Sequence, residues 1–483
     1  MNEPDAPLDR RSARAGRSFL ARHRAAVRVA AGAALFALLG GAMVAVGAST
    51  AGRMPVAAVS PTAAVPAASA QPTARPVPAA TTVPGRLRTC SVAGLAADPR
   101  LAHFQAHVVN ADTGEVLFDR GGRTASRTAS VLKVLTSAAA LSVLGPDYRA
   151  TTTVVAGSEP GQVVLVGGGD VTLSRTPSGN ESVYAGAAHL DELARQTTAA
   201  WTAAHPGTPI TSLVLDASLF GGPGWQPGWA RTELAAGYMP EITALQVDGD
   251  REDPYRGTSP RSEDPIGRAG QAFADALGGG VSISRGTAPA GAAKLAAVSS
   301  QPVSTLVKQS LIVSDNAVAE MLARLVAVES GAGNTFDALQ QGIVGGLEPY
   351  GIDTTGIVIT DGSGLSVDNA VAPAYLTRLF VKVHRREGSL GVIADGLPVA
   401  GRTGSLSYSD RFAGANAAAD GAVFAKTGWI DTGYTLSGII HAADGTPLTF
   451  AVYALGDVSD NAKQAIDTIT TGFFRCGDNL SNN

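Results

Sequence analysis

The chain has 483 residues, of which 45% are hydrophobic, 16% are charged and 57 are glycines. This length leaves room for two or three domains, and the composition excludes a short peptide, a coiled coil and a disordered chain. The net charge is -4, although residues 1–28 carry seven arginines against three acidic residues, so the remainder is clearly acidic. A nucleic-acid partner is therefore not expected for the folded part.

Residues 29–48 form an uncharged run directly after the basic segment 1–28. As a helix, this run is long enough to cross ~30 Å of hydrocarbon. The positive-inside bias would keep the arginines in the cytoplasm and export the rest of the chain. We therefore expect a cytoplasmic basic tail, a single transmembrane helix and an extracytoplasmic remainder in the cell membrane. A cleaved secretory signal is the alternative, because residues 46–48 are small enough for a cleavage site.

Residues 49–86 are rich in proline and alanine, which predicts an extended linker between the membrane and the next domain. The only two cysteines, Cys90 and Cys476, lie at the two ends of the globular part of the chain. In an exported chain this placement favours one disulfide that joins the ends of the fold, with two unrelated buried thiols as the alternative. A short flexible tail is expected at 477–483.

Between the cysteines, strands and helices are predicted from the spacing of apolar residues and from turn signals. In chain order they are a hairpin at 103–118, a helix at 130–144, strands at 151–155 and 162–166, helices at 185–204 and 304–328, strands at 421–426, 434–441 and 448–455, and a helix at 461–474. Strands at both ends around central helices predict an α+β fold whose sheet is completed by both ends of the domain.

Ser130 and Lys133 stand three residues apart at the start of the alanine-rich helix, a spacing that places hydroxyl and amine on one helix face. A serine nucleophile needs a base, and a desolvated lysine can act as one, whereas arginine keeps its proton. The chain has six lysines among its 37 lysine and arginine residues, so lysine is rare relative to arginine. Taken alone, the pattern also arises by chance at the start of an amphipathic helix.

Two further short motifs lie later in the chain. Ser314, Asp315 and Asn316 precede a helical run, and the same triplet recurs at 459–461, where Ser459 is expected to cap the last helix. The triplet at 426–428, Lys-Thr-Gly, occurs once, at the end of a strand-like run, and an exposed strand end is the alternative interpretation.

In this order, Ser-x-x-Lys, Ser-x-Asn and Lys-Thr-Gly resemble the three motifs of penicillin-binding proteins and β-lactamases. With further stretches at 165–173, 361–366, 404–412 and 425–428, the chain resembles the S13 peptidase family of D-alanyl-D-alanine carboxypeptidases and endopeptidases, which are low-molecular-weight penicillin-binding proteins. The order selects Ser314 over Ser459.

The resemblance implies the β-lactamase/DD-peptidase fold, also called the penicillin-binding transpeptidase-like fold. Its catalytic domain would comprise residues 87–145 and 301–476. The long separation of Ser130 from Ser314 matches the family's inserted domain, here at 146–300.

The resemblance also implies roles at the reacting bond. Ser130 would attack the carbonyl of the penultimate D-alanine and form an acyl-enzyme, with Lys133 as its base. Ser314 would pass a proton to the leaving D-alanine, and Asn316 would hold the substrate amide and help to position Lys133. β-Lactam antibiotics would acylate Ser130 as covalent inhibitors.

Lys426 and Thr427 would bind the terminal carboxylate, and Gly428 would let the substrate backbone lie against the strand. The backbone N–H groups of Ser130 and Trp429 would form the oxyanion hole. Trp429 departs from the family pattern, because many relatives carry serine or threonine there, and a side-chain hydroxyl for the carboxylate is lost.

The sequence thus predicts a serine-type D-Ala-D-Ala carboxypeptidase or endopeptidase that acts on peptidoglycan stem peptides during cell wall biogenesis. No cofactor is expected, and no cluster of cysteine and histidine indicates a metal site. The alternatives are a catalytically weak cell-wall-binding scaffold on the same fold and a β-lactamase, which would need an efficient deacylation route.

Overall fold

The computed structural model describes residues 86–483. The predicted basic tail, the transmembrane helix and nearly all of the linker lie outside the described residues. Within residues 86–483, no helix is both long and apolar enough to cross a membrane. The membrane anchor and its alternative, a cleaved signal, therefore both stay predictions.

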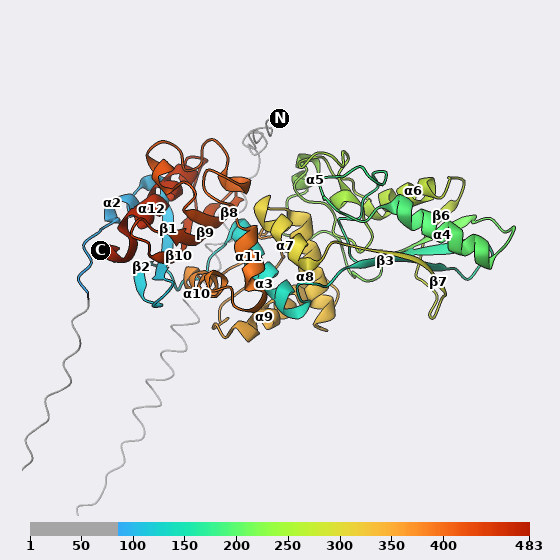
Figure 1. Cartoon of the computed structure of the whole chain (residues 1–483), viewed down its shortest axis with the longest axis horizontal. Coiled ribbons are helices and arrows are strands. Elements are labelled where there is room, and N and C mark those ends of the chain that lie inside the picture. Colours follow the sequence, from blue (N-terminus) through green and yellow to red (C-terminus); the bar gives the residue numbers. More distant parts are fainter. Residues whose placement is uncertain (1–85) are drawn as a thin grey trace, which may run out of the picture. The chain divides into compact units, whose positions relative to one another are not determined.

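One sheet has five antiparallel strands in the order β2-β1-β10-β9-β8 (Figure 1). Its strands are β1 (His103–Asn110), β2 (Val116–Arg120), β8 (Val423–Ile430), β9 (Gly433–His441) and β10 (Pro447–Leu455). Because β1 pairs with β10, the sheet is completed by strands from both ends of the described chain, as predicted.

The two faces of this sheet belong to different apolar cores. Along β10, Phe450, Val452 and Ala454 lie in a core with α2 (Ala93–Ala96) and α12 (Ala462–Cys476), while Ala451, Tyr453 and Leu455 lie in a core with α10 (Pro373–His384). Successive strand residues point to opposite faces, so a strand covered by helices on both sides is apolar throughout. This explains the apolar run at 450–455.

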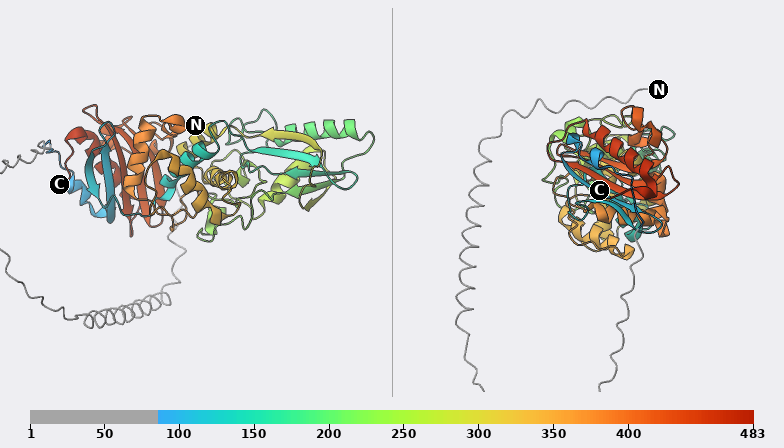
Figure 2. Two further views of the ribbon diagram at one scale, coloured as in Figure 1. Left: turned by 90° about the horizontal axis from the view of Figure 1, so that it is seen from below. Right: turned by 90° about the vertical axis from the view of Figure 1, so that its left-hand side faces the viewer.

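A helical layer contributes most of the second of these cores. It contains α3 (Lys133–Val143), α7 (Val303–Ile312), α8 (Asn316–Glu329), α9 (Leu339–Leu347) and α11 (Gly391–Gly396). Residues 317–327 of α8 are all buried, which is the mark of a helix surrounded by others. Figure 1 and the left view of Figure 2 agree that these helices lie between the first sheet and a second one.

The second sheet lies between α3 and α7 in the chain. Its strands are β3 (Thr151–Ala156), β4 (Gln162–Val166), β5 (Ser212–Asp216), β6 (Ser282–Arg285) and β7 (Lys294–Ser299), in the order β6-β5-β4-β3-β7, and its helices are α4 (Leu190–Ala204), α5 (Thr232–Ala236) and α6 (Pro265–Ala276). Strands β4, β5 and β6 run parallel, and the sheet has an apolar core of its own. Residues 86–483 nevertheless lie in one compact unit, so the domain boundaries at 146 and 300 remain predictions.

The two ends of the described chain meet. The predicted disulfide is present between Cys90 and Cys476, which are 386 residues apart with their Cα atoms separated by 5.5 Å. The residues after Cys476 differ from the expected flexible tail at 477–483. Leu480 is fully buried and bridges to Cys90, and the Ser481 N–H donates to the Cys90 carbonyl at 2.9 Å. One buried leucine and the neighbouring disulfide hold this segment in place.

Several element boundaries also differ from the sequence analysis; the strand expected at 421–426, for example, is β8 at Val423–Ile430. The helix expected at 185–204 begins at Leu190, and the one expected at 304–328 is broken at 313–315 into α7 and α8. Ser459 does not cap α12, because its hydroxyl donates to the Asn461 side chain instead. In the other triplet, Asp315 caps α8 by accepting from the Val318 N–H at 3.0 Å.

Removing the bridge with the double substitution Cys90→Ala/Cys476→Ala should lower the free energy of unfolding by ~2–4 kcal/mol. The loss should fall in the lower part of that range, because β1–β10 pairing already brings the two ends of the chain together. Urea unfolding of both proteins measures it. A reductant should destabilise the wild type and leave the double variant unchanged, and equal stability of the two oxidised proteins would contradict a structural role for the bridge.

Candidate active site

Ser130 lies in a short 3-10 turn, Ala129–Leu132, that leads directly into α3. Ala129, just before it, has a φ of +46°, a left-handed conformation that costs energy for a residue with a side chain. The cost is met by packing on both sides, because Ala129 is buried against Gly364 and Gly428, whose missing side chains leave the space. The turn is therefore held in one place by its neighbours.

Lys133 is the first residue of α3, and its side chain is completely buried. Its Nζ donates to Ser130 Oγ at 2.9 Å, to Asn316 Oδ1 at 2.7 Å and to the Ser363 carbonyl at 2.8 Å. Three acceptors satisfy all three donors of an ammonium group. The predicted proximity of Ser130 and Lys133 is present, with Asn316 beside them.

Ser314 lies at the break between α7 and α8, with a φ of +59°. This conformation turns the chain so that Ser314 Oγ accepts from Lys426 Nζ at 2.8 Å, while Asn316 in the first turn of α8 contacts Lys133. Lys426 comes from β8, the edge strand, and also donates to the Thr427 carbonyl at 2.8 Å. The four residues expected at the reacting bond and Lys426 thus share one site.

Both lysines are buried, and burial acts against their charge. Burial lowers the pKa of Lys133 to about 8, although the carboxylates of Glu320, Asp361 and Asp315 act in the opposite direction. Burial and then the charge of Lys133 lower the pKa of Lys426 well below its usual value. The free site therefore favours fewer than two positive charges, and Lys133 is suited to accept a proton near neutral pH.

Glu320 and Asp361 were not identified from the sequence as site residues. Glu320 accepts from the N–H groups of Gly362 at 2.9 Å and Ser363 at 2.7 Å, and Ser363 is the residue whose carbonyl binds Lys133. Burial and the neighbouring Asp361 raise the pKa of Glu320 to about 8. The available signal was an acid within residues 317–327 of α8, which are apolar apart from Glu320 and Arg324.

Asp361 shapes the same loop from inside. Its carboxylate accepts from the N–H groups of Gly364 at 2.7 Å and Ser366 at 2.6 Å, and from the Trp229 indole at 2.8 Å. Both acids thus act on Lys133 through the 361–366 loop as well as through their charge. The stretch contributed to the family resemblance, but nothing in it revealed this role.

The residues after Lys426 lie along β8. The Thr427 hydroxyl is 2.7 Å from the Ser405 hydroxyl, a residue for which the sequence gave no role. A side chain on Gly428 would lie 2.7 Å from the Thr128 carbonyl and 3.0 Å from the Ala129 Cβ, so glycine is needed to let β8 approach the serine turn. Trp429 is 39% exposed, with its ring centroid 6.3 Å from that of Tyr434.

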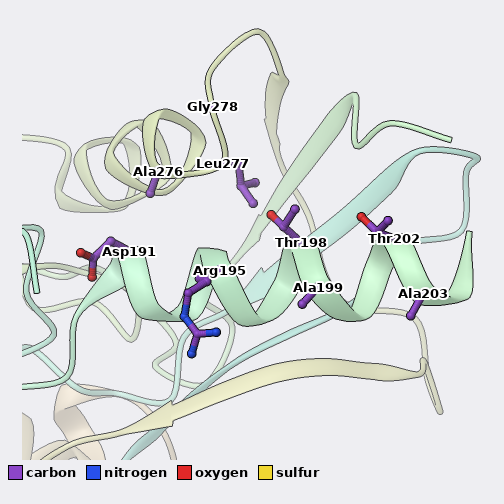
Figure 3. Close-up of a pocket in the computed structure, with 9 residues that line it drawn as sticks. All are labelled: Asp191, Arg195, Thr198, Ala199, Thr202, Ala203, Ala276, Leu277 and Gly278. Atoms are coloured by element: carbon purple, nitrogen blue, oxygen red, sulfur yellow. The ribbon is translucent and has the colours of Figure 1, made fainter. Parts of the chain in front are cut away.

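A separate depression of about 820 Å³ lies between α4 and the end of α6 (Figure 3). Its walls are mainly threonine and alanine from α4, and Asp191 and Arg195 of the same helix also line it. None of the predicted site residues lines it. Within residues 86–483, no group of three or more histidine, cysteine, aspartate or glutamate side chains is placed to hold a metal ion.

Comparison with known proteins identifies relatives over most of the chain. Residues 89–255 and 250–473 match the model of the Peptidase_S13 family, described as the D-Ala-D-Ala carboxypeptidase 3 (S13) family. Carboxypeptidase DacB of Mycolicibacterium smegmatis is 36% identical over 394 residues, which cover 80% of this chain and 84% of the relative. The D-alanyl-D-alanine carboxypeptidase of an Actinomadura strain is 29% identical over 439 residues, covering 75% and 79%.

A solved structure is similar in fold. Penicillin-binding protein 4 of Haemophilus influenzae superposes with a TM-score of 0.64 at 19% identity, over 77% of this chain and 96% of that protein. The same protein in complex with a β-lactam gives a TM-score of 0.57 at 20% identity, with the same coverage. The expected α+β fold is therefore confirmed, and it is similar to the fold of penicillin-binding protein 4.

Replacing the glycine of the edge strand tests how the serine turn is held. In Gly428→Ala, the added methyl group should push β8 away from Thr128 and Ala129 and lower the free energy of unfolding by ~1–3 kcal/mol, the usual cost of overpacking. Thermal unfolding measures the change.

Gly445→Ala is the control, because Gly445 lies in the turn between β9 and β10 and its added side chain would meet nothing within 4 Å. It has a φ of +85°, so it should show a conformational cost only. Wild-type stability of Gly428→Ala would contradict the close approach.

Proposed function

Because the chain belongs to the S13 family of D-Ala-D-Ala carboxypeptidases, we propose that it cleaves the terminal D-Ala-D-Ala bond of peptidoglycan stem peptides through an acyl-enzyme on Ser130. The chain is a serine peptidase of this family. The observation that carries the assignment of residues is the contact of the buried Lys133 amine with Ser130 Oγ at 2.9 Å. An amine with a lowered pKa at this distance can take the hydroxyl proton.

In the proposed acylation step, neutral Lys133 accepts the Ser130 proton while Oγ forms a bond to the carbonyl carbon of the penultimate D-alanine. The oxyanion that develops is met by the backbone N–H groups of Ser130 and Trp429. Ser314 then gives its proton to the leaving amino group, and the proton that Lys133 accepted replaces it, while the positive charge of Lys426, which donates to Ser314 Oγ at 2.8 Å, stabilises that oxygen. The C–N bond breaks, D-alanine leaves, and water later hydrolyses the ester.

The substrate carboxylate can influence the charges of the two lysines. In the free site, burial and mutual repulsion oppose two positive charges. A carboxylate bound near Lys426, Thr427 and Ser405 would favour the charged form of Lys426. The charged Lys426 would in turn favour the neutral form of Lys133, so binding of the correct substrate end would prepare the base.

β-Lactams are proposed as covalent inhibitors of the same site. The support is the fold shared with penicillin-binding protein 4 of Haemophilus influenzae, which has been solved in complex with a β-lactam. In a β-lactam the leaving amine stays covalently attached to the acyl group, so the ester on Ser130 should persist long enough to be detected by mass spectrometry.

Export and membrane attachment form the second part of the proposal. The Cys90–Cys476 disulfide supports an oxidising compartment, since such bridges are rare in the cytosol. The arginine-rich segment 1–28 and the uncharged run 29–48 support a retained anchor over secretion.

The proposed function is tested by intact-protein mass spectrometry after incubation with benzylpenicillin and, separately, with a muropeptide ending in D-Ala-D-Ala. We expect a mass increase of one penicillin on the wild type, located at Ser130 by peptide mapping, and release of D-alanine from the muropeptide. Ser130→Ala should show neither. D-Alanine release by Ser130→Ala, or penicillin on another serine, would refute the assignment.

The rate of acylation by penicillin should depend on pH through Lys133. Because its pKa is lowered to about 8, the amine is mostly protonated at pH 6 and cannot take a proton, whereas it is mostly neutral at pH 9.5. The rate should therefore rise as the pH is raised from 6 towards 8 and the neutral form of Lys133 becomes populated. Stopped-flow measurements with a fluorescent penicillin between pH 5.5 and 10 give the profile.

Two substitutions serve as controls for this profile. Lys133→Arg keeps a positive charge but has no accessible neutral form, so acylation should fall by ~10²-fold or more at every pH. Lys426→Arg should retain a larger part of the rate, because a guanidinium still binds a carboxylate. If Lys133→Arg is acylated as fast as Lys426→Arg, Lys133 is not the proton acceptor.

A further inference from the structure

The segment between α3 and α7 reaches the Ser314–Asn316 triplet through a buried ion pair. Arg251 Nη2 lies 3.0 Å from Asp315 Oδ2, and both side chains are about 5% exposed. Tyr184, also from this segment, donates from its hydroxyl to the same Asp315 oxygen at 3.1 Å and accepts from Arg251 at 2.7 Å. One oxygen of Asp315 is therefore fully committed to the second-sheet part of the fold.

The other oxygen of Asp315 determines where α8 begins. It accepts from the Val318 N–H at 3.0 Å as the N-cap of α8, the helix that carries Asn316 in its first turn. Ser314, on the other side of Asp315, has the left-handed φ that directs its hydroxyl to Lys426. A shift of Asp315 would move both neighbours at once.

Asn316 has a second attachment to the same segment. Its Nδ2 donates to the Tyr238 carbonyl at 3.0 Å, while its Oδ1 accepts from Lys133 at 2.7 Å. The amide is thus oriented from outside the catalytic motifs, with its oxygen towards the lysine.

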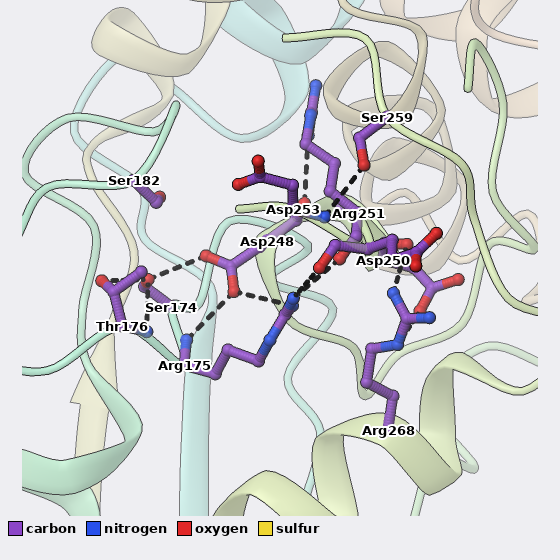
Figure 4. A network of polar contacts seen from close by, with 12 residues as sticks. Ser174, Arg175, Thr176, Ser182, Asp248, Asp250, Arg251, Asp253, Ser259 and Arg268 are labelled. Atoms are coloured by element: carbon purple, nitrogen blue, oxygen red, sulfur yellow. Dashed lines mark hydrogen bonds and ion pairs between the residues drawn. The ribbon is translucent and has the colours of Figure 1, made fainter. Parts of the chain in front are cut away.

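Arg251 is itself held by a rigid surrounding. The loop before it has three consecutive left-handed residues, Asp248 with a φ of +50°, Gly249 with +58° and Asp250 with +58°. As Figure 4 shows, Asp248 lies between Ser174 and Arg175, and Arg268 reaches Asp250. These contacts stabilise a backbone that would otherwise be unfavourable, and they fix the direction in which Arg251 leaves the loop.

We infer that Arg251 is a positioning residue for acylation: through its ion pair with Asp315 it holds Ser314 against Lys426 and Asn316 against Lys133. The inference rests on the proposed function of Ser130. The hydrogen bonds of Arg251 go to Gly257, Tyr184, Asp248 and Asp315 and to none of the predicted catalytic residues, so its effect on them passes through Asp315. Removing the guanidinium leaves a buried carboxylate without its counter-ion, and that carboxylate will turn towards another donor or water.

The test is a double-mutant cycle of Arg251→Met and Asp315→Asn. Acylation by a fluorescent penicillin is measured at pH 9.5, above the pKa of Lys133, so that changes in its protonation do not obscure the result. Arg251→Met should slow the acylation step by ~10–100-fold, the scale expected for misplaced catalytic groups, with little change in the initial non-covalent binding of penicillin. Asp315→Asn keeps an acceptor for the Val318 N–H but loses the charge that orients it, so it should also be slower.

In the Asp315→Asn background, adding Arg251→Met should slow acylation by less than a further ~2-fold, because the effects of two residues that act through one contact are not additive. Additive losses would overturn the inference. Arg251→Lys should recover part of the rate lost in Arg251→Met, which a merely structural defect would not allow. If Arg251→Met does not fold, Asp315→Asn and Arg251→Lys still decide, since wild-type acylation in both would overturn the inference.

Arg268→Met is the matched control. It removes the Arg268–Asp250 ion pair from the same loop without touching Asp315. It should lower the melting temperature and leave the acylation rate within ~2-fold of the wild type. If it slows acylation as much as Arg251→Met, integrity of the loop is what matters and the inference is wrong. Failure of the proposed function itself is distinguishable, because then the wild type would not be acylated at Ser130 at all.

Discussion

A lysine side chain with no exposed surface must find every hydrogen-bond partner inside the protein, and this constraint organises the site around Lys133. Its three acceptors come from three separate parts of the chain: the serine turn, the first turn of α8 and the 361–366 loop. An unsatisfied amine at this depth would cost several kcal/mol, so the three parts are held together by the same group that we propose as the base. In this proposal, proton transfer and assembly of the site depend on one nitrogen atom.

The second lysine limits how that nitrogen can be charged. Two ammonium groups in one buried site repel, and the acids near Lys133 offset this only in part, because Glu320 is itself buried next to Asp361 and its own pKa is raised. Both acids accept from backbone N–H groups of the 361–366 loop, so they stabilise that loop whatever the charge of the lysine. Holding the loop in place is therefore a reason for Glu320 and Asp361 to be present, although the proposed base, Lys133, must be neutral to accept a proton.

Much of the fold and of the site followed from sequence, and the failures have specific physical causes. The central strands and α3 were predictable, because burial on both faces requires unbroken apolar runs and Gly145 ends the helix. The break at 313–315 was not, because the apolar spacing continues through it and only the left-handed Ser314 interrupts the helix. The short motifs identified Ser130, Lys133, Ser314, Asn316 and Lys426, but gave no sign of partners distant in sequence, such as Glu320. Gly428 was expected to make room for substrate, and in the structure it also makes room for the close approach of Ala129.

The second sheet is attached to the catalytic residues more firmly than an insertion requires. Where it leaves and rejoins the helical layer, the Ser304 N–H donates to the Pro146 carbonyl at 2.9 Å and the Ser300 N–H donates to the Ala150 carbonyl at 2.8 Å. These two hydrogen bonds join the beginning and the end of the segment that contains the second sheet, which would be sufficient to attach a separate unit. The buried contact of Arg251 with Asp315 adds a third attachment directly beside Ser314. Burial of a charge pair is costly and contributes little net stability, so its value lies in fixing one geometry. The segment between the two serine motifs is thus best understood as part of the frame that holds the catalytic groups in place.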